Sequence, residues 1–242
     1  MKNLAIFFHS VLFWMYITVA FIIGFLVSLL FSLFKKNKSK FFHRFSQIWF
    51  KDYFLPFSRT KMEISGLKNI PKGKPVIFAS NHQSLMDIPL LLASLPGTYH
   101  FVAKRELFSI PLIGWYIGWA GHLRIDRANS ISAKKTLDKV VASLKKGESI
   151  IIFPEGTRSR TGKLNEFKRG SLLAAFNAGV PVIPVTIQGS FEIMPKGTLL
   201  LNPTKVKILI GRPIPFVKSE RPSKKEQLEV SNKIRNAIAS ML

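Results

Sequence analysis

The sequence predicts an α/β protein: a mixed, mostly parallel sheet covered by helices, preceded by a membrane-embedded helical segment. Two observations lead to this fold class. From residue 58 onward, short apolar runs alternate with helix-length patterns, which is typical of a sheet covered on both faces. Residues 4–34 form one long apolar run, and 47% of the 242 residues are hydrophobic. We therefore expect membrane-anchoring helices over residues 1–57 and an α/β domain over residues 58–242.

The apolar run at residues 4–34 carries no charge apart from a possible one on His9. It exceeds the roughly 20 residues that cross a bilayer, and it is too long for a signal peptide and lacks a clear cleavage site. The basic sequence KKNKSK follows it at residues 35–40, whereas only Lys2 and the amino terminus precede it. This asymmetry predicts that the α/β domain lies on the cytoplasmic face of the cell inner membrane.

A second segment, residues 41–57, is dense in aromatic residues that are broken by His43, Arg44, Lys51 and Asp52. The mixture favours an interfacial helix at about residues 39–56, with its rings at the headgroup level and its basic groups on anionic lipid. A core helix of the α/β domain is the alternative. The two segments form either a hairpin that dips into one leaflet or a spanning helix followed by a surface helix.

The rest of the chain supplies the sheet and the helices that cover it. We expect strands at residues 62–65, 75–80, 99–104, 122–125, 149–153, 181–187 and 206–211, and helices at residues 85–95, 131–146, 169–178 and 223–242. One more apolar segment, residues 110–121, is too short to span a membrane. Its Gly114 and Gly118 stand four residues apart, a spacing that suits close helix packing.

The charge balance and the missing residue types limit the possible functions. The chain has 36 lysines and arginines against 13 acidic residues, a net charge of +23. Such a balance favours nucleic acid, an anionic bilayer or a phosphorylated substrate as partner. The absence of cysteine excludes disulfides and thiolate chemistry. There is no P-loop and no G-x-S-x-G elbow, and the histidines lack metal-ligand spacing, so we expect no metal.

Polar residues stand at the carboxyl ends of three expected strands, where open α/β sheets bind ligands. His82, Arg127 and Glu155 each follow one of these strands, so we expect a single site. Asp87 comes five residues after His82, and an aspartate that accepts from one ring nitrogen leaves the other nitrogen free as a base. The alternatives are a structural histidine, and an Asp87 that caps the next helix or completes a capping box with Ser84.

Four segments, taken in order, resemble the motifs of the glycerolipid acyltransferases. They are Asn81-His82 with Asp87, residues 121–127 (GHLRIDR), residues 153–159 (FPEGTRS) and residues 180–185 (VPVIPV). The resemblance spans roughly residues 60–215, and four ordered motifs are far more specific than one. It is strongest to the bacterial 1-acyl-sn-glycerol-3-phosphate acyltransferases, also called lysophosphatidic acid acyltransferases. Arg124 departs from the pattern, because that family usually has an apolar or aromatic residue there.

The resemblance implies a reaction and the residues that carry it. A fatty acyl group moves from the thioester of acyl-CoA or acyl carrier protein to the sn-2 hydroxyl of 1-acyl-sn-glycerol 3-phosphate, and the product is phosphatidic acid. His82 would be the general base, Asp87 would orient it, and no cofactor is implied. Residues 180–185 would be a buried supporting strand, and residues 110–121 would be a wall of an acyl-chain tunnel. The implied substrate-binding residues are Arg127, Glu155, Gly156, Thr157 and Arg158, with a secondary role for Lys104.

Three other functions stay open at the level of sequence. The acceptor could be glycerol 3-phosphate or another lysolipid, although a membrane anchor favours a lysolipid. A hydrolase of acyl-CoA is a second possibility, and a non-catalytic basic membrane tether that binds anionic lipid or nucleic acid is a third. We predict that membrane lipid and an acyl thioester are the partners, and that nucleic acid is not a partner. The sequence does not predict the oligomeric state.

Overall fold

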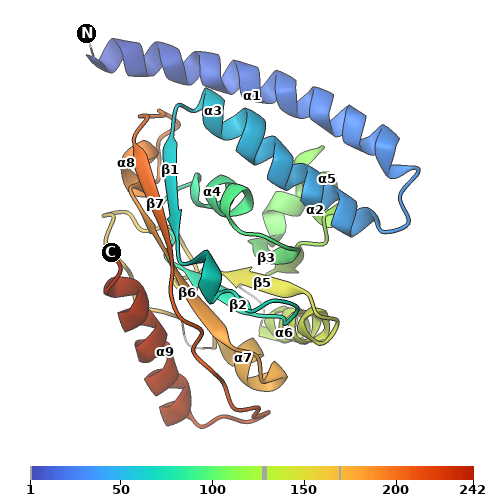
Figure 1. Cartoon of the computed structure of the whole chain (residues 1–242), viewed down its shortest axis with the longest axis vertical. Coiled ribbons are helices and arrows are strands. Elements are labelled where there is room, and N and C mark those ends of the chain that lie inside the picture. The colour runs from blue at the N-terminus through green and yellow to red at the C-terminus, as the bar shows by residue number, and fades with distance from the viewer. Residues whose placement is uncertain (1, 127–129, 169) are drawn as a thin grey trace.

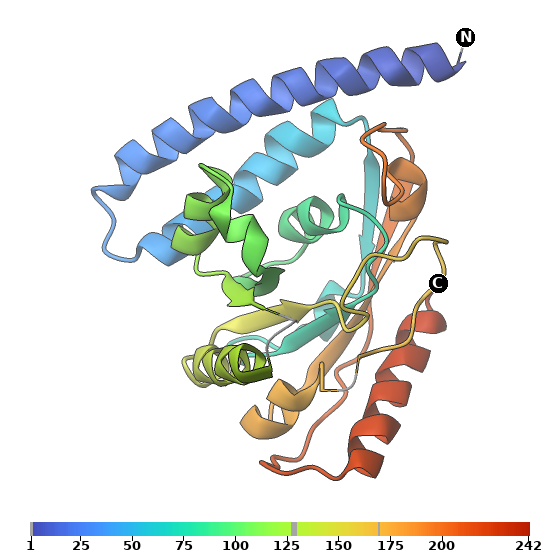
Figure 2. The ribbon, with the colours of Figure 1, turned by 180° about the vertical axis from the view of Figure 1, so that it is seen from behind.

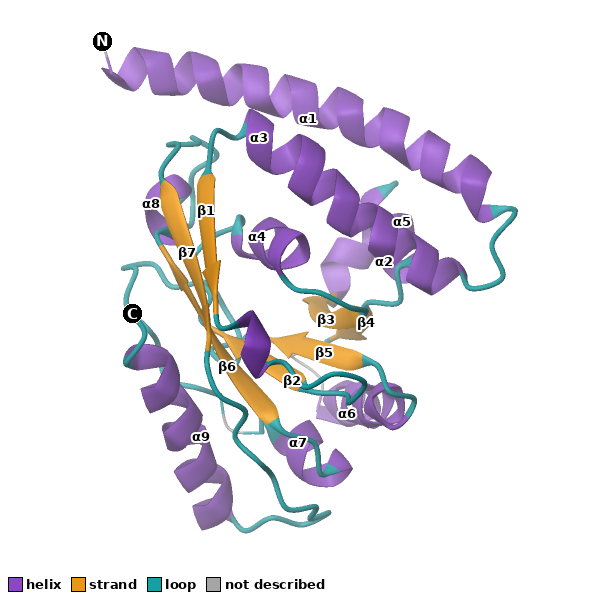
Figure 3. Cartoon of the chain, viewed as in Figure 1, coloured by secondary structure: helices purple, strands orange, loops and turns teal. Residues whose placement is uncertain are grey.

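The protein is built on a seven-stranded sheet that lies between helices (Figures 1 and 3). The computed structural model describes residues 2–126, 130–168 and 170–242. The strands are β1 (Lys61–Ser65), β2 (Ile77–Ser80), β3 (Tyr99–Lys104), β4 (Leu123–Ile125), β5 (Ser149–Ile152), β6 (Val182–Gln188) and β7 (Lys205–Ile210). They follow the order β1-β7-β6-β2-β5-β3-β4 across the sheet, so each of the seven expected strands is present.

The strand directions bring the carboxyl ends of several strands to the same end of the sheet, where a site can form. β6 and β7 pair antiparallel, while the other neighbouring strands in the described chain pair parallel. β2 to β6 therefore run in one direction, and β1 and β7 run in the opposite one. The expected mixed, mostly parallel sheet is confirmed. The loops after β2, β5 and β6 leave the sheet at the same edge, where α/β sheets bind ligands.

One face of the sheet is covered by α6 (Ser130–Lys145), α7 (Leu173–Ala178) and α9 (Lys224–Ala239) (Figures 1 and 2). Ile77 of β2 points into this layer, whereas its neighbour Phe78 packs in the opposite one, as the two-residue period of a strand requires. The helix expected at residues 169–178 begins only at Leu173. Gly170 has a φ of 84°, which a continuous helix does not accommodate.

The other face carries α4 (Asp87–Ser94), α5 (Ile113–Trp119) and the N-terminal helices. α1 (Lys2–Ser32) is followed by α2 (Lys38–Trp49), which continues through the π-helical η1 (Phe50–Phe54) into α3 (Leu55–Phe57). The two arms form a hairpin across this face (Figures 1 and 2). Asn37 caps the second arm, since its side chain accepts a hydrogen bond from the backbone N–H of Lys40 at 2.9 Å.

The hairpin shares the core of the α/β domain. Phe13 of α1 is fully buried, and it packs in one cluster with Phe54 and Leu55 of the second arm and with Leu90 of α4. Four residues of α2 are also buried, namely Phe42, His43, Ser46 and Gln47. The second arm therefore packs against the domain along one side, as the alternative for residues 41–57 has it, while contact of its other side with lipid stays a prediction.

The outer side of α1 is apolar and exposed. Within the described chain, α1 is long and apolar enough to cross a membrane. Its side chains that are more than half exposed include Leu4, Phe7, Phe8, Leu12, Met15, Val19, Ile23, Leu26, Leu30 and Phe31. An exposed apolar surface of this size is typical of a protein that associates with a membrane.

Candidate active site

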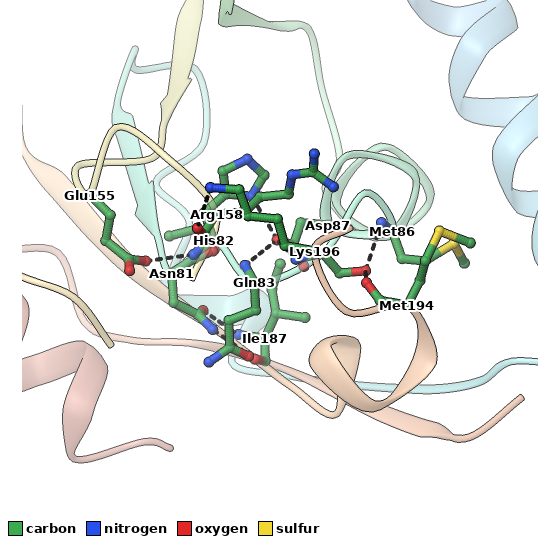
Figure 4. A network of polar contacts seen from close by, with 12 residues as sticks. Asn81, His82, Gln83, Met86, Asp87, Glu155, Arg158, Ile187, Met194 and Lys196 are labelled. Atoms are coloured by element: carbon green, nitrogen blue, oxygen red, sulfur yellow. Dashed lines mark hydrogen bonds and ion pairs between the residues drawn. The ribbon is translucent and has the colours of Figure 1, made fainter. Parts of the chain in front are cut away.

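His82 and Asp87 form the pair that the sequence predicted. The ring Nδ1 of His82 donates a hydrogen bond to Oδ2 of Asp87 at 2.7 Å (Figure 4). The Asp87 side chain is fully buried, while that of His82 is 17% exposed. None of the described residues hydrogen-bonds Nε2 of His82. The carboxylate therefore fixes the ring so that the free nitrogen is the unprotonated one, as a general base requires.

Asp87 also organises the turn between β2 and α4. Its Oδ2 accepts the backbone N–H groups of Gln83 at 2.7 Å and Ser84 at 2.9 Å. α4 begins at Asp87, so Pro89 lies in the first turn, where its missing N–H costs nothing. The reach of Asp87 back to Ser84 is the acidic half of a capping box. The oxygen that orients the histidine thus also closes the turn before α4, but it does not cap the helix, whose N-cap position is Met86 without a side-chain hydrogen bond.

The loop that carries His82 is held on three sides. The Asn81 side chain pairs with both backbone groups of Ile187 in β6, at 2.9 and 2.8 Å. Ser84 Oγ donates to the carbonyl of Met194 at 2.8 Å. The His82 ring stacks on Phe153, with ring centroids 4.0 Å apart and planes 16° apart. These contacts leave the imidazole little freedom to rotate, which favours a fixed catalytic geometry.

Glu155 braces this loop from the neighbouring strand. Oε1 accepts the backbone N–H of His82 at 2.7 Å, and Oε2 accepts that of Asn165 at 2.9 Å. Burial raises the pKa of Glu155, and these hydrogen bonds to Asn165 and His82 act in the opposite direction. We expected Glu155 to hold the substrate. In the structure both of its oxygens face the protein interior, so the residue positions His82, and contact with substrate stays a prediction.

The turn after Glu155 brings two cations close to His82. Gly156 has a φ of 71°, and a Cβ there would come within 2.8 Å of the Lys168 side chain. Thr157 is exposed, and its Oγ1 accepts a hydrogen bond from Lys196 Nζ at 3.0 Å. Lys196 Nζ also donates to the carbonyl of Arg158 at 3.3 Å. Figure 4 shows Arg158 and Lys196 together with His82.

The remaining expected site residues are less closely connected. Lys104 is 60% exposed and pairs with Glu106 at 3.0 Å, and no hydrogen bond or ion pair within the described chain joins it to His82. The guanidinium of Arg124 lies 5.2 Å from the centroid of the Phe108 ring. This cation–π contact explains how the second motif accommodates a charge where an apolar residue is usual. Arg127 lies outside the described residues.

An apolar cavity of about 550 Å³ lies beside the site. Leu85, three residues after His82, lines it, and so does Phe101, whose ring stacks at 6.3 Å on Phe153. Its walls come from α1, α2, η1, α4, η3 (Arg105–Ser109) and α5, and include Phe21, Trp49, Ile88, Leu92, Leu107 and Tyr116. Segment 110–121 contributes through α5. Gly114 in the same helix allows the close packing, since a Cβ there would meet the backbone of Phe108.

A family model described as acyltransferase matches residues 61–188, more than half of the chain. The chain belongs to the acyltransferase family. It is 40% identical over 184 residues to a chloroplastic 1-acyl-sn-glycerol-3-phosphate acyltransferase of Brassica napus, covering 75% of this chain and 53% of that protein. A 1-acyl-sn-glycerol-3-phosphate acyltransferase of Pseudomonas aeruginosa is 36% identical over 152 residues, which cover 62% and 58% of the two chains.

Structural comparison extends the likeness to the N-terminal helices. The crystal structure of a 1-acyl-sn-glycerophosphate acyltransferase from Thermotoga maritima matches with a TM-score of 0.82 at 31% identity, covering 100% of this chain and 98% of that chain. This chain spans about half the length of the plant relatives that it matches. The resemblance inferred from four short motifs is therefore confirmed at the level of the family and the fold.

Two contributors to the site were not predicted from the sequence. Lys196 follows the four motifs in an unremarkable segment, MPKGT, and nothing in its neighbours marks it. Phe153 stands inside the third motif, but its stacking on His82 depends on β2 and β5 being adjacent. A strand order cannot be read from a local pattern, so neither contact had a detectable signal in the sequence.

Proposed function

We propose that this protein transfers a fatty acyl group from an acyl thioester to the sn-2 hydroxyl of 1-acyl-sn-glycerol 3-phosphate, giving phosphatidic acid. The observation that carries the proposal is the His82–Asp87 pair, with Nε2 free, at a strand end between an apolar cavity and two cations. An acyl chain suits the cavity, and a phosphate suits the cations. The names of the relatives support the choice of acceptor.

The reaction follows from the free nitrogen of His82. Nε2 takes the proton of the sn-2 hydroxyl while the oxygen attacks the thioester carbonyl, and Asp87 stabilises the imidazolium that forms. When the tetrahedral intermediate collapses, the C–S bond breaks and the proton passes from His82 to the leaving thiolate. The products are an ester and a free thiol, with no acyl-enzyme intermediate. A general base of this kind contributes about 10² to 10⁴ in rate.

The acyl donor and the acceptor bind to different parts of the site. The acyl chain of the donor occupies the apolar cavity, which buries it from water. Arg158 binds the acceptor phosphate, for which its planar guanidinium offers two parallel donors. The donor is coenzyme A thioester or acyl carrier protein thioester. The proposed reaction requires no cofactor, because a thioester is already activated.

The membrane arrangement belongs to the same proposal. α1 packs on the protein along its length, through Phe13, Ile17 and Phe25. A perpendicular crossing would carry the packed domain into the hydrocarbon layer, where its polar groups would lack partners. We therefore favour an α1 that lies in the plane of one leaflet, with the exposed side in lipid. The basic residues 35–40 support a location on the cytoplasmic face of the inner membrane.

The proposal is tested with purified protein in detergent, labelled acyl donor and a panel of acceptors, with products identified by mass. The panel contains 1-acyl-sn-glycerol 3-phosphate, glycerol 3-phosphate, other lysolipids and a reaction without acceptor. We expect phosphatidic acid from the first acceptor. Fatty acid released without an acceptor would indicate a hydrolase instead. Absence of any product, together with salt-dependent binding to anionic vesicles, would indicate a tether.

A further inference from the structure

The loop between α8 (Ser190–Ile193) and β7 contacts both the His82 loop and α1. Its ends are closed by a hydrogen bond from the backbone N–H of Asn202 to the carbonyl of Ile193 at 2.9 Å. Gly197 turns the chain with a φ of 99°. On one side of this turn Met194 is buried and accepts from Ser84 of the His82 loop. The loop is thus fixed to the site at its first residue.

Lys196 carries a charge that the protein does not neutralise. Its side chain is half-buried, and its ammonium donates to Thr157 Oγ1 at 3.0 Å and to the carbonyl of Arg158 at 3.3 Å. Both acceptors are neutral, and one of the three ammonium donors is left over. Throughout the described ranges, neither Lys196 nor Arg158 has a carboxylate within ion-pair distance. Two unpaired cations at one turn are stabilised by an anion that binds both.

The other side of the turn is attached to the apolar helix. Trp14 of α1 donates its indole N–H to the carbonyl of Leu199 at 2.8 Å, and the backbone N–H of Leu201 donates to Ser10 Oγ at 2.8 Å. Leu201 is fully buried, whereas Leu199 is 62% exposed and Leu200 is 46% exposed. The loop therefore holds two leucines in solvent beside the N-terminal half of α1, which itself exposes large apolar side chains.

The spacing of these residues fits the depth of a lipid headgroup layer. Lys196 and Leu199 are three positions apart, which allows a reach of up to roughly 10 Å between their Cα atoms. A bilayer of about 40–45 Å has a hydrocarbon core of about 30 Å, which leaves about 5–8 Å for the polar layer on each side. A loop with leucines in the hydrocarbon boundary can thus place an ammonium at the level of the phosphates.

We propose that residues 195–201 hold the acceptor headgroup at the membrane surface. Lys196 supplies a second cation beside Arg158 for the phosphate of the lysolipid, and Leu199 and Leu200 enter the lipid next to α1. The inference rests on the proposed function, because it assumes an acceptor with a phosphate. It explains how an acceptor can present its phosphate and sn-2 hydroxyl to His82 while its acyl chain stays in the membrane.

The role of Lys196 is tested with Lys196→Gln and Lys196→Arg, using Lys225→Gln on the exposed start of α9 as a matched loss of one charge. We expect Lys196→Gln to raise the KM for 1-acyl-sn-glycerol 3-phosphate about tenfold or more while the donor KM stays within about twofold. Lys196→Arg should keep most of the acceptor affinity, since the charge remains. Lys225→Gln should behave as wild type.

An equilibrium measurement separates phosphate binding from a structural role. In the inactive His82→Ala background, Lys196→Gln should weaken binding of lysophosphatidic acid in micelles about tenfold and leave binding of 1-monoacylglycerol unchanged. If Lys196 only clamps the Thr157–Arg158 turn, both KM values should rise together and the Tm should fall. That result, or an unchanged acceptor KM, would overturn the assignment. A wild-type protein without acyl transfer to lysophosphatidic acid would refute the proposed function itself.

The lipid contact is tested with Leu199→Asn combined with Leu200→Asn. Leu228→Asn on α9 is the control, because Leu228 is 63% exposed and lies in a helix on the opposite face of the sheet. The double variant should raise the KM for acceptor embedded in vesicles and leave the KM for a water-soluble, short-chain acceptor unchanged. An equal effect on both acceptors, or no effect on either, would show that these leucines do not enter the lipid.

Discussion

One oxygen of Asp87 accepts hydrogen bonds from the ring of His82 and from the backbone N–H groups of Gln83 and Ser84. The carboxylate is fully buried, so the charge of Asp87 is stabilised by these donors rather than by water. At the scale of single residues, the function and the local fold thus depend on the same atom. Substitutions at the two positions of the pair should separate the contributions.

His82→Ala should abolish acyl transfer without unfolding the protein. The ring is partly exposed at a strand end, and its loop is held by Asn81 and Glu155 through contacts that do not involve the imidazole. We expect a loss of about 10² to 10⁴ in kcat with a normal Tm and normal flotation with liposomes. Turnover within tenfold of wild type would refute the role of His82 as the base.

Asp87→Asn should lower both turnover and stability. The amide oxygen can take the place of Oδ2, but it carries no charge, so it accepts from His82 and from the two backbone donors more weakly than the carboxylate does. We expect the ring to lose its preferred tautomer, and the turn before α4 to be destabilised by about 1 kcal/mol or more. Measurement of kcat beside Tm distinguishes the two effects. A lower Tm with normal kcat would show that Asp87 only stabilises the turn before α4.

At the scale of elements, α1 has one side that packs in the protein core and one apolar side that is exposed. Phe13 is fully buried in the core, while its neighbour Leu12 is 60% exposed. At 1.5 Å per residue, the helix of 31 residues measures about 46 Å, more than the hydrocarbon thickness of about 30 Å. Deletion of residues 1–57 would remove Phe13, Phe54 and Leu55 from the core, so point substitutions are the sharper test.

We expect the two sides of α1 to respond differently to substitution. Leu12→Glu combined with Leu26→Glu should reduce flotation with neutral liposomes and leave the Tm in detergent unchanged, because both side chains are more than half exposed. Phe13→Ala should leave flotation intact and lower stability by about 3–5 kcal/mol, the usual cost of removing a buried aromatic ring. If the glutamate variant floats like wild type, the membrane surface lies elsewhere.

At the scale of the whole molecule, three histidines from distant segments meet beneath α2. The rings of His43, His100 and His122 lie 6.2 to 6.4 Å apart, centroid to centroid. Burial lowers the pKa of His43 to about 4 and that of His122 to about 3, with a further contribution from the neighbouring histidines. Burial also lowers the pKa of His100, although Glu148 at 3.4 Å opposes the change.

This cluster predicts a loss of stability in mild acid. The unfolded chain binds protons at these histidines below about pH 6.5, whereas the folded protein resists protonation until about pH 4 at His43. The free energy of unfolding should therefore fall as the pH drops from about 6.5 towards 4, by on the order of 3 kcal/mol from His43. His43→Gln, which can still donate to Gly97, should flatten the dependence of Tm on pH between 7 and 5. An unchanged slope would contradict the burial argument.

Much of this architecture was accessible from the sequence. The seven strands were predictable because buried parallel strands are short, apolar and bounded by polar turns. The His82–Asp87 pair was predictable because both residues belong to one turn, and a histidine in that turn can fold back onto a helix-start carboxylate. The apolar character of α1 followed directly from composition. Each of these features depends on residues that are close together along the chain.

The features that could not be predicted depend on residues that are far apart in the chain. The sequence could not show that Glu155 bonds the backbone of His82, that Lys196 reaches Thr157, or that β7 turns antiparallel to β6. Nor could it show that Phe13 is buried while Leu12 faces outward, since both stand in the same apolar run. The local periodicity of a segment indicates which of its sides is apolar and which is polar. The segment against which the apolar side packs is set by the packing of the whole chain, because burial depends on neighbours in space and not on neighbours in sequence.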